Sequence, residues 1–373
     1  MQHLARACLP LALVGCQTII GADFGSAQGP TPCQSFEPPK RPANLSQASD
    51  TVDFTVVIDQ LAFGDESDAG STGAVGFDLD GLCTVPGGTP SCKAFPWLSS
   101  TAVVDGPGGR DDAVGNLFLA QKKVFGGSLI GSAEENDGVA SGTAAPAGIL
   151  RVRGFSGLGS DDHVVVELFQ AASFASVRQP GKGGDGGHGR PSFDASDQWP
   201  LVRATLVDAD SGAPLESTQR DDNAFVLDST LVAHFDELRL PMHNIYVDVS
   251  KAMLSGHLGY NSSTGWTISN GTLGARIRSD FLLGFVPLAT RSAVNVTLCT
   301  DDVANYQVVK KTLCEAADLP EIDGDPSSHC AFTSLGVGFQ SSPASLGNVV
   351  DVPPTANPCP PETDPANDTC ARP

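Results

Sequence analysis

The sequence predicts a mainly β protein, an antiparallel sandwich or jelly-roll-like fold held by disulfides, with one helix late in the chain. Glycine and proline are abundant, with 41 and 27 residues. Short runs rich in valine, threonine and leucine alternate with turn residues at a spacing of about 8–12 positions, which is typical of sandwiches. Together these features favour strands and turns over long helices.

The expected strands begin with residues 54–63, a run rich in β-branched and aromatic side chains. Residues 149–155 alternate apolar and charged side chains, as a half-buried antiparallel strand does. Residues 162–169 follow across a Gly-Ser turn and complete a hairpin. Further strands are expected at 201–207, 224–227, 230–240, 245–249, 253–260, 266–268 and 273–277.

Helices are expected at two places. Residues 301–319 place apolar side chains at helical spacing, with acidic residues at the start, and predict the late helix. Residues 117–130 form a mildly apolar stretch that is compatible with a second helix.

The chain divides into four expected parts. Residues 1–15 form a signal peptide and residues 16–50, rich in Gly, Pro, Ser and Gln, a flexible tether. Residues 51–350 form the β-rich domain, as one unit or as two packed subdomains. Residues 351–373 are rich in proline and are expected to be an extended tail.

The N-terminus has the pattern of a secretion signal. Arg6 precedes an apolar run at residues 7–14, which is far shorter than the ~20 residues that span a bilayer. Small Gly15 ends the run, as at a signal-peptide cleavage site. An ordinary signal peptide that is cut further along, past Ala22 or Ala27, is one interpretation.

The tetrapeptide Leu13-Val14-Gly15-Cys16 also resembles the lipobox of bacterial lipoproteins. This resemblance implies cleavage before Cys16 and several acyl chains on that residue, which hold a protein on a membrane better than one chain does. Gln17 is not the aspartate that retains many such proteins at the inner membrane. The expected location is therefore a bacterial membrane surface, with the outer membrane favoured.

The cysteine count agrees with export. Cys8 leaves with the signal and Cys16 carries the lipid, so an even number of the ten cysteines remains. An even number in an exported chain predicts disulfides. The candidates are Cys33, Cys83, Cys92, Cys299, Cys314, Cys330, Cys359 and Cys370. Short loops favour the pairs Cys83–Cys92 and Cys359–Cys370, with Cys299 joined to Cys314 or Cys330. A zinc site is disfavoured because the chain has no CxxC pair.

The net charge of −21 disfavours nucleic acid as a partner, because such a surface repels phosphate. The sequence contains no GxSxG elbow, no HExxH pair and no phosphate-binding loop. No catalytic residue is therefore assigned. A pair of loop carboxylates for glycoside hydrolysis stays open, because such residues need only be close in space.

Acidic loops are the best candidate sites. Calcium is bound by six to eight oxygens, which loop carboxylates and backbone carbonyls supply. The candidate ligands of a structural calcium lie on loops that are expected to meet at one end of the fold: Asp65, Asp68, Asp78, Asp80, Asp111 and Asp112. The alternative is that these are solvated turn aspartates, since paired acids recur elsewhere in this acidic chain.

Aromatic side chains suggest a second kind of site. Trp266 follows a turn and Tyr260 lies on the preceding strand, so the two could stack against a sugar. Packing in the core is the alternative for Trp266.

Several segments resemble a group of secreted lipoproteins common in myxobacteria and their relatives. The segments are GFDLDGLCT at 76–84, GGRDDAVGN at 108–116, LSGHL at 254–258 with 265–276, and 330–339 running on to 343–347. The resemblance implies an exported, anchored bacterial protein and implies no reaction. That group often has Asp-Asn after the arginine, whereas this chain has Asp111-Asp112, so no role of that amide carries over.

The expected function is that of a cell-surface lipoprotein with a non-catalytic binding or structural role, whose partner is a glycan or another surface protein. A surface polysaccharide hydrolase that uses loop carboxylates, and a calcium-stabilised adhesion scaffold, are the alternatives.

Overall fold

A closed antiparallel sheet organises the protein. The computed structural model describes residues 35–43, 51–64, 75–99, 103–125, 132–176, 189–209, 214–242, 245–294, 296–353 and 355–373. From Ser35 to Pro373 the chain forms one compact unit. The mainly β, antiparallel and disulfide-linked fold expected from the sequence is confirmed.

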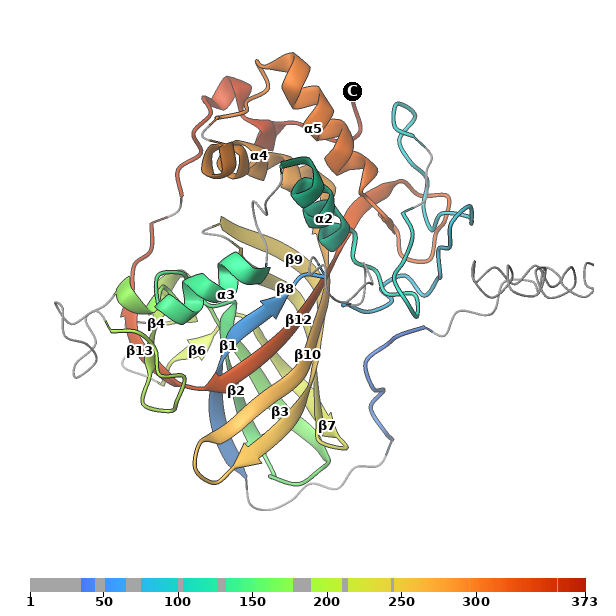
Figure 1. Cartoon of the computed structure of the whole chain (residues 1–373). Helices are drawn as coiled ribbons and strands as arrows, with labels where there is room; N and C mark the ends of the chain where they lie inside the picture. The colour runs from blue at the N-terminus through green and yellow to red at the C-terminus, as the bar shows by residue number, and fades with distance from the viewer. Residues whose placement is uncertain are drawn as a thin grey trace, which may run out of the picture. The chain divides into compact units, whose positions relative to one another are not determined.

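The strands of the main sheet follow the order β1-β2-β3-β7-β8-β9-β10-β12-β11, and β1 also pairs with β12 (Figure 1). This last pairing closes the sheet, so opposite walls pack across one core as two layers of a sandwich do. The strands are β1 Val52–Ala62, β2 Gly148–Phe155, β3 Asp161–Phe169, β7 Arg220–Leu227, β8 Thr230–Met242, β9 Ile245–Asn261, β10 Gly265–Arg278, β11 Leu319–Pro320 and β12 Cys330–Pro343. Two short sheets complete the strands of the described residues. One pairs β4 Gln198–Val202 with β13 Ser345–Val350, and the other pairs β5 Leu206–Val207 with β6 Glu216–Ser217.

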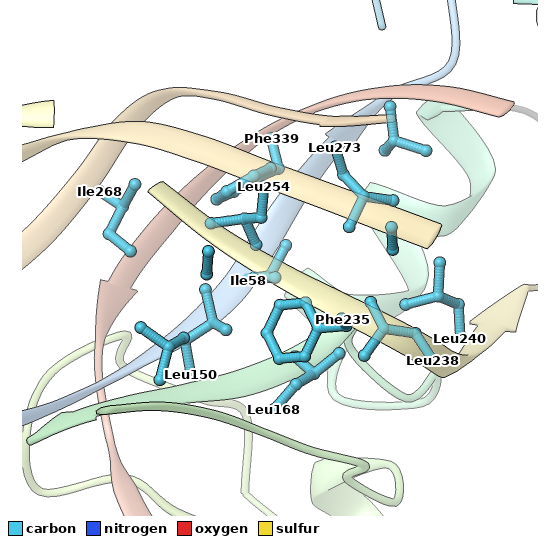
Figure 2. Packing of buried hydrophobic residues seen from close by; sticks show 14 of the residues in the cluster. Ile58, Leu150, Leu168, Phe235, Leu238, Leu240, Leu254, Ile268, Leu273 and Phe339 are labelled. Atoms are coloured by element: carbon cyan, nitrogen blue, oxygen red, sulfur yellow. The ribbon is translucent and has the colours of Figure 1, made fainter. Parts of the chain in front are cut away.

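Alternation along β1 explains how its two faces are used. Val56 and Ile58 point into the closed sheet, where they join the large apolar cluster shown in part in Figure 2. Val57 points the other way, into a second cluster with Phe169 and Trp199. Each such buried side chain contributes about 1.5–3 kcal/mol. The cavity found among the core side chains measures about 30 Å³, so the sheet encloses a packed core.

In the part of the chain that the structure describes, four helices accompany the sheet: α2 Ala113–Phe125, α3 Ser132–Ser141, α4 Ser279–Val294 and α5 Val303–Glu315. α5 is the late helix that the sequence predicts, and α2 overlaps the apolar stretch 117–130. α4 is a further late helix. It follows β10 directly and packs against α5, and it contains Pro287, a residue that disfavours a helix interior.

Several strand boundaries differ from the prediction. The expected strands at 245–249 and 253–260 are one strand, β9, and those at 266–268 and 273–277 are one strand, β10. Between the expected pieces the register of the β9–β10 pair shifts, and Lys251 and Asn270 have positive φ, so each strand continues through a β-bulge. The expected strand 201–207 is interrupted by a 3₁₀ turn at Arg203–Thr205.

The expected disulfide pairs are wrong, although the seven candidate cysteines within the described residues are all disulfide-bonded. The bonds are Cys92–Cys330, Cys299–Cys359 and Cys314–Cys370, and Cys83 is also disulfide-bonded. A disulfide needs Cα atoms about 4.4–6.8 Å apart, and here that proximity arises from the fold, because the bonded residues are 238, 60 and 56 positions apart. Cys16 and Cys33 lie outside the described residues.

The C-terminal segment is therefore docked on the helices. Its two bonds attach it to α5 and to the segment before α5. Lys310, almost fully buried on α5, lies 2.8 Å from Asp368, and Tyr306 donates to the same carboxylate at 3.0 Å. The proline-rich segment 351–373 contains two 3₁₀ turns, Pro361–Thr363 and Pro365–Asn367.

Candidate functional site

Two loops and part of β12 meet at one place in the fold. They are the loop 75–84, the loop 103–112 before α2, and residues 334–336 of β12. The N–H of Asp111 donates to the carbonyl of Phe77 at 3.0 Å, and the N–H of Leu79 donates to Asp111 Oδ2 at 2.6 Å. The two loops are thus joined by backbone and side-chain bonds.

Two glycines allow this close approach. Gly76 has φ of +95°, and a Cβ on it would lie 2.8 Å from the carbonyl oxygen of Asp111. A Cβ on Gly336 would lie 2.8 Å from the carbonyl oxygen of Val75. Because real Cβ contacts are essentially never this short, both positions favour glycine for the loop to lie on the strand.

Asp112 fixes the start of α2 on the strand. Its Oδ1 accepts from the N–H of Gly115 and from the N–H of Gly336, each at 3.0 Å. The first bond is an N-cap of α2. The neighbouring N–H of Ala113 donates to Ser334 Oγ at 2.8 Å. Asp112 therefore serves a positioning role beside the acidic cluster described next.

Asp78, Asp80 and Asp111 form an acidic cluster in which one carboxylate oxygen of each lies within 4.8 Å of the others. Asp78 and Asp111 are buried and Asp80 is half-buried. Backbone N–H groups orient all three. Gly81 donates to Asp78 Oδ1 at 2.7 Å, and Leu82 donates to Asp80 Oδ1 at 2.8 Å. Asp78 Oδ2 is buried and accepts no hydrogen bond.

Together with burial, two further carboxylates, those of Asp105 and Asp318, raise the pKa of Asp111 in the cluster. Burial raises the pKa of Asp111 to about 10, and the charges of Asp318, Asp80 and Asp105 add to this effect. Burial also raises the pKa of Asp105 to about 7, with the charges of Asp80 and Asp78 adding to it. Such shifts are expected where like charges are buried together.

Asp318 is buried and accepts from both the N–H and the hydroxyl of Ser334. Burial nevertheless raises its pKa to about 7. The pKa of Asp80 is also raised, chiefly by burial, and the charge of Arg276 opposes this rise. Arg276 donates to the carbonyl of Leu79 and pairs with Asp323, so its charge offsets only part of the negative charge of the cluster.

One hollow borders Asp105 and Asp318, and another borders Asp78. A cavity of about 310 Å³ is lined by Asp105, Asp318, Phe95 and the Cys92–Cys330 disulfide, which places it at the lower end of the range for small-ligand sites. A more open groove of about 680 Å³ is lined by residues 37–41, Asp78, Leu79, Asp221 and His234, among others.

The structure brings together three of the six predicted calcium ligands. Asp65 and Asp68 lie outside the described residues, and Asp112 accepts hydrogen bonds from the start of α2 and from β12. Sequence reasoning missed Asp105 and Asp318. Asp105 precedes the GGRDD segment by only a few residues, which is a usable signal, whereas nothing near Asp318 in the sequence indicates a site.

The aromatic candidates lie at the other end of the β9–β10 hairpin. Trp266 packs against the core, where its ring stacks on that of Phe54 at 5.2 Å and meets that of Phe155 edge-on at 5.3 Å. Tyr260 lies 5.0 Å from Trp266, between ring centroids, and is 64% exposed. The exposed aromatic surface is thus that of Tyr260.

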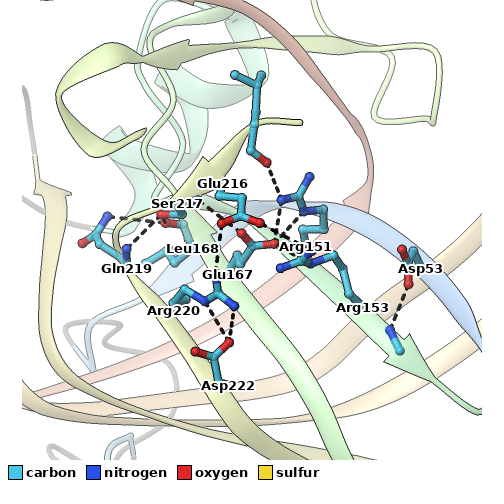
Figure 3. A network of polar contacts seen from close by, with 12 residues as sticks. Asp53, Arg151, Arg153, Glu167, Leu168, Glu216, Ser217, Gln219, Arg220 and Asp222 are labelled. Atoms are coloured by element: carbon cyan, nitrogen blue, oxygen red, sulfur yellow. Dashed lines mark hydrogen bonds and ion pairs between the residues drawn. The ribbon is translucent and has the colours of Figure 1, made fainter. Parts of the chain in front are cut away.

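A separate charged network joins β2, β3, β6 and β7 (Figure 3). Glu167 is fully buried and pairs with Arg151 at 2.7 Å and Arg153 at 3.0 Å. Arg220 pairs with Glu216 at 3.1 Å and with Asp222. Because the carboxylates here face guanidinium groups, this network balances its charge, unlike the acidic cluster.

Comparisons of the chain with protein-family models, with curated proteins and with solved structures find no match. Among the helices of the described residues, none combines the length and the apolar character needed to cross a bilayer.

Proposed function

We propose that this protein is an exported bacterial lipoprotein, held at the membrane by acyl chains on Cys16, with the outer membrane favoured. On this proposal its folded part is a non-catalytic binding or structural module at the cell surface, related to the myxobacterial-type secreted lipoproteins.

The observation that carries the proposal is the use of cysteine. All seven cysteines within the described residues are disulfide-bonded. Disulfides persist in oxidising compartments outside the cytosol. Together, the bonds fix long loops and the C-terminal segment to the sheet and the helices, as suits a protein exposed outside the cell.

The packed core supports binding at the outer surface. A cavity of about 30 Å³ among the described core side chains is far smaller than the roughly 300–1,000 Å³ of small-ligand sites, too little for an organic ligand. The outer surface offers the groove of about 680 Å³ and the exposed ring of Tyr260. A glycan or another surface protein is the partner we propose, because aromatic rings and polar grooves suit such ligands.

Intact mass spectrometry of the protein purified from membranes of its host tests this proposal. We expect a chain that starts at a triacylated Cys16 and gains two hydrogens for each disulfide on reduction. A mass that starts at Met1, with free thiols, would contradict the anchor, the export and the surface role together.

A surface hydrolase is the second candidate, and one observation favours it. Asp105 and Asp318 both line the cavity of about 310 Å³, and both have pKa values raised to about 7, near the value that suits a general acid. Release of reducing sugar from polysaccharides by the native protein, and its loss in Asp105→Asn, would establish this candidate. No release from polysaccharides of the host envelope would remove its support.

A further inference from the structure

We infer that Asp78, Asp80 and Asp111 bind one calcium ion, which joins the two loops that hold the N-terminal segment 35–43 on the folded domain. This inference concerns the folded domain alone and does not depend on the anchor at Cys16 or on the surface role.

The spacing of the oxygens fits one ion. Calcium lies about 2.3–2.6 Å from each of its oxygens, so ligands on opposite sides of it are up to about 5 Å apart. The three carboxylates offer oxygens within 4.8 Å of one another, so a single ion can contact all of them. A set of carboxylates suits a hard cation, whereas zinc sites are usually built from histidine and cysteine.

Asp78 gives an independent reason to expect a ligand. Its residue is only 5% exposed, and Oδ2 is buried without a hydrogen-bond partner. A buried carboxylate oxygen without a partner is costly. The other oxygen is held by the N–H of Gly81 at 2.7 Å, so the carboxylate keeps its orientation in the cluster. A cation between the three carboxylates supplies the missing partner.

The charge around the cluster agrees with a bound cation. Asp105 accepts from the N–H of Thr84 and Asp318 accepts from the N–H of Ser334, so the segments that meet at the cluster hold two further carboxylates. Arg276 is shared with the carbonyl of Leu79 and with Asp323. A doubly charged ion between the three ligands offsets part of this negative charge.

The same two loops hold Phe36. The N–H of Phe36 donates to the carbonyl of Gly108 in one loop, and its carbonyl accepts from the N–H of Asp78 in the other, each at 2.9 Å. The ring of Phe36 stacks on Phe77 at 5.8 Å and faces the guanidinium of Arg110 at 3.6 Å. An ion that fixes both loops therefore also stabilises the docked N-terminal segment.

Calcium titration of the full chain, stripped with EGTA, tests the inference. Thermal unfolding and calorimetry should show one ion bound per chain. We expect a dissociation constant on the order of 10⁻⁴–10⁻³ M, as in extracellular modules, and a melting temperature that rises by several degrees at 10-fold saturation or more. Hydrogen exchange of residues 35–43 should slow when calcium is present.

The variants Asp78→Asn and Asp80→Asn should lose at least 10-fold in calcium affinity. Asp325→Asn is the matched control. Asp325 accepts from the N–H two residues on, as Asp80 does, but is exposed and distant from the cluster in the sequence. Circular dichroism shows whether each variant folds.

The wild-type measurement decides the inference even if a variant does not fold. No uptake of calcium by the wild-type chain at 10 mM, or tighter binding of magnesium than of calcium, would overturn it. Equal calcium affinity in the folded Asp78→Asn and Asp325→Asn variants would also overturn it. Calcium binding without a change in exchange at residues 35–43 would overturn the proposed coupling to the N-terminal segment.

Discussion

The N–H of Gly336 on β12 donates a 3.0 Å hydrogen bond to Asp112 Oδ1, across 224 positions of sequence. The same oxygen accepts from Gly115 in the first turn of α2. One carboxylate oxygen thus fixes the start of a helix to the strand that closes the sheet, immediately after the candidate ligand Asp111.

This geometry predicts that Asp112→Ala strongly destabilises the protein. The substitution removes the N-cap of α2, worth about 0.5–2 kcal/mol. It also leaves the buried N–H of Gly336 without this acceptor, at about 1–3 kcal/mol. We expect the free energy of unfolding to fall by about 3 kcal/mol in urea denaturation.

Asp302→Ala is the control for Asp112→Ala. Asp302 occupies the N-cap position of α5, but its side chain makes no capping hydrogen bond. We expect a change within about 0.5 kcal/mol, as for an ordinary surface position. Equal effects of the two substitutions would show that the bonds of Asp112 are not what holds α2 on β12.

Gly76→Ala tests the close approach of the loop to β12. Alanine at a φ of +95° is strained, and its Cβ would lie 2.8 Å from the carbonyl of Asp111. We expect a loss of stability of about 3 kcal/mol or more, since the strain of about 1–3 kcal/mol adds to a clash with backbone. Gly81→Ala has a similar φ of +76° but no atom within 4 Å of its Cβ.

The comparison of these two glycine variants separates strain from contact. Gly81→Ala should lose only about 1 kcal/mol of stability. Its affinity for calcium should fall less than that of Gly76→Ala. If Gly76→Ala were no less stable than Gly81→Ala, the loop would have room to move away from the strand, and the described contact would not be required.

The sequence predicts the parts of this fold that depend on neighbouring residues better than the parts that depend on distant ones. Alternation and turn residues act locally, and they correctly indicate β1, β2 and β3. The same local turn signals divide β9 and β10 where the ladder continues. The closure of the sheet by β1 and β12 depends on partners at opposite ends of the chain, which no local pattern specifies.

The candidate site shows the same limit. Asp78, Asp80 and Asp111 lie in two short segments rich in aspartate and glycine, so the sequence predicts them as members of one site. Asp318 contributes to the site only because β11 pairs with β12. The predicted disulfide pairs are wrong for a related reason. Loop length favours cysteines that are close in the sequence, whereas the docked C-terminal segment brings Cys370 to Cys314.

Two aromatic variants test the proposed glycan-directed surface. Tyr260→Ala should weaken glycan binding by about tenfold, equivalent to about 1.4 kcal/mol, while stability changes by about 0.5 kcal/mol or less because the ring is 64% exposed. Trp266→Ala should lose about 3 kcal/mol of stability, since its ring packs on Phe54 and Phe155.

Leu158→Ala is the control for Tyr260→Ala, because Leu158 is a comparably exposed apolar residue elsewhere, at 58%. Binding would be measured on an array of surface polysaccharides. Unchanged binding in Tyr260→Ala, together with measurable binding by the wild type, would move the glycan site to another surface, with the groove beside residues 37–41 as the next to test.

The acidic cluster predicts a pH dependence of stability that calcium should reverse. In EGTA, the pKa values of Asp105 and Asp318 are raised to about 7, from the ordinary value of 3.8, mainly by burial. Between these values the native state binds more protons than the unfolded state, so the free energy of unfolding falls as pH rises. The melting temperature in EGTA should therefore drop as the pH rises from about 4 to about 7.

Saturating calcium should remove or invert this dependence, because the ion favours the ionised carboxylates and competes with protons. Asp105→Asn in EGTA should also show a weaker dependence, because the substituted residue no longer titrates. Differential scanning calorimetry at constant ionic strength would measure both effects. A melting temperature that rises with pH in EGTA would mean that these carboxylates are ionised and stabilised in the native protein, which conflicts with the uncompensated charge that the structure places around Asp111.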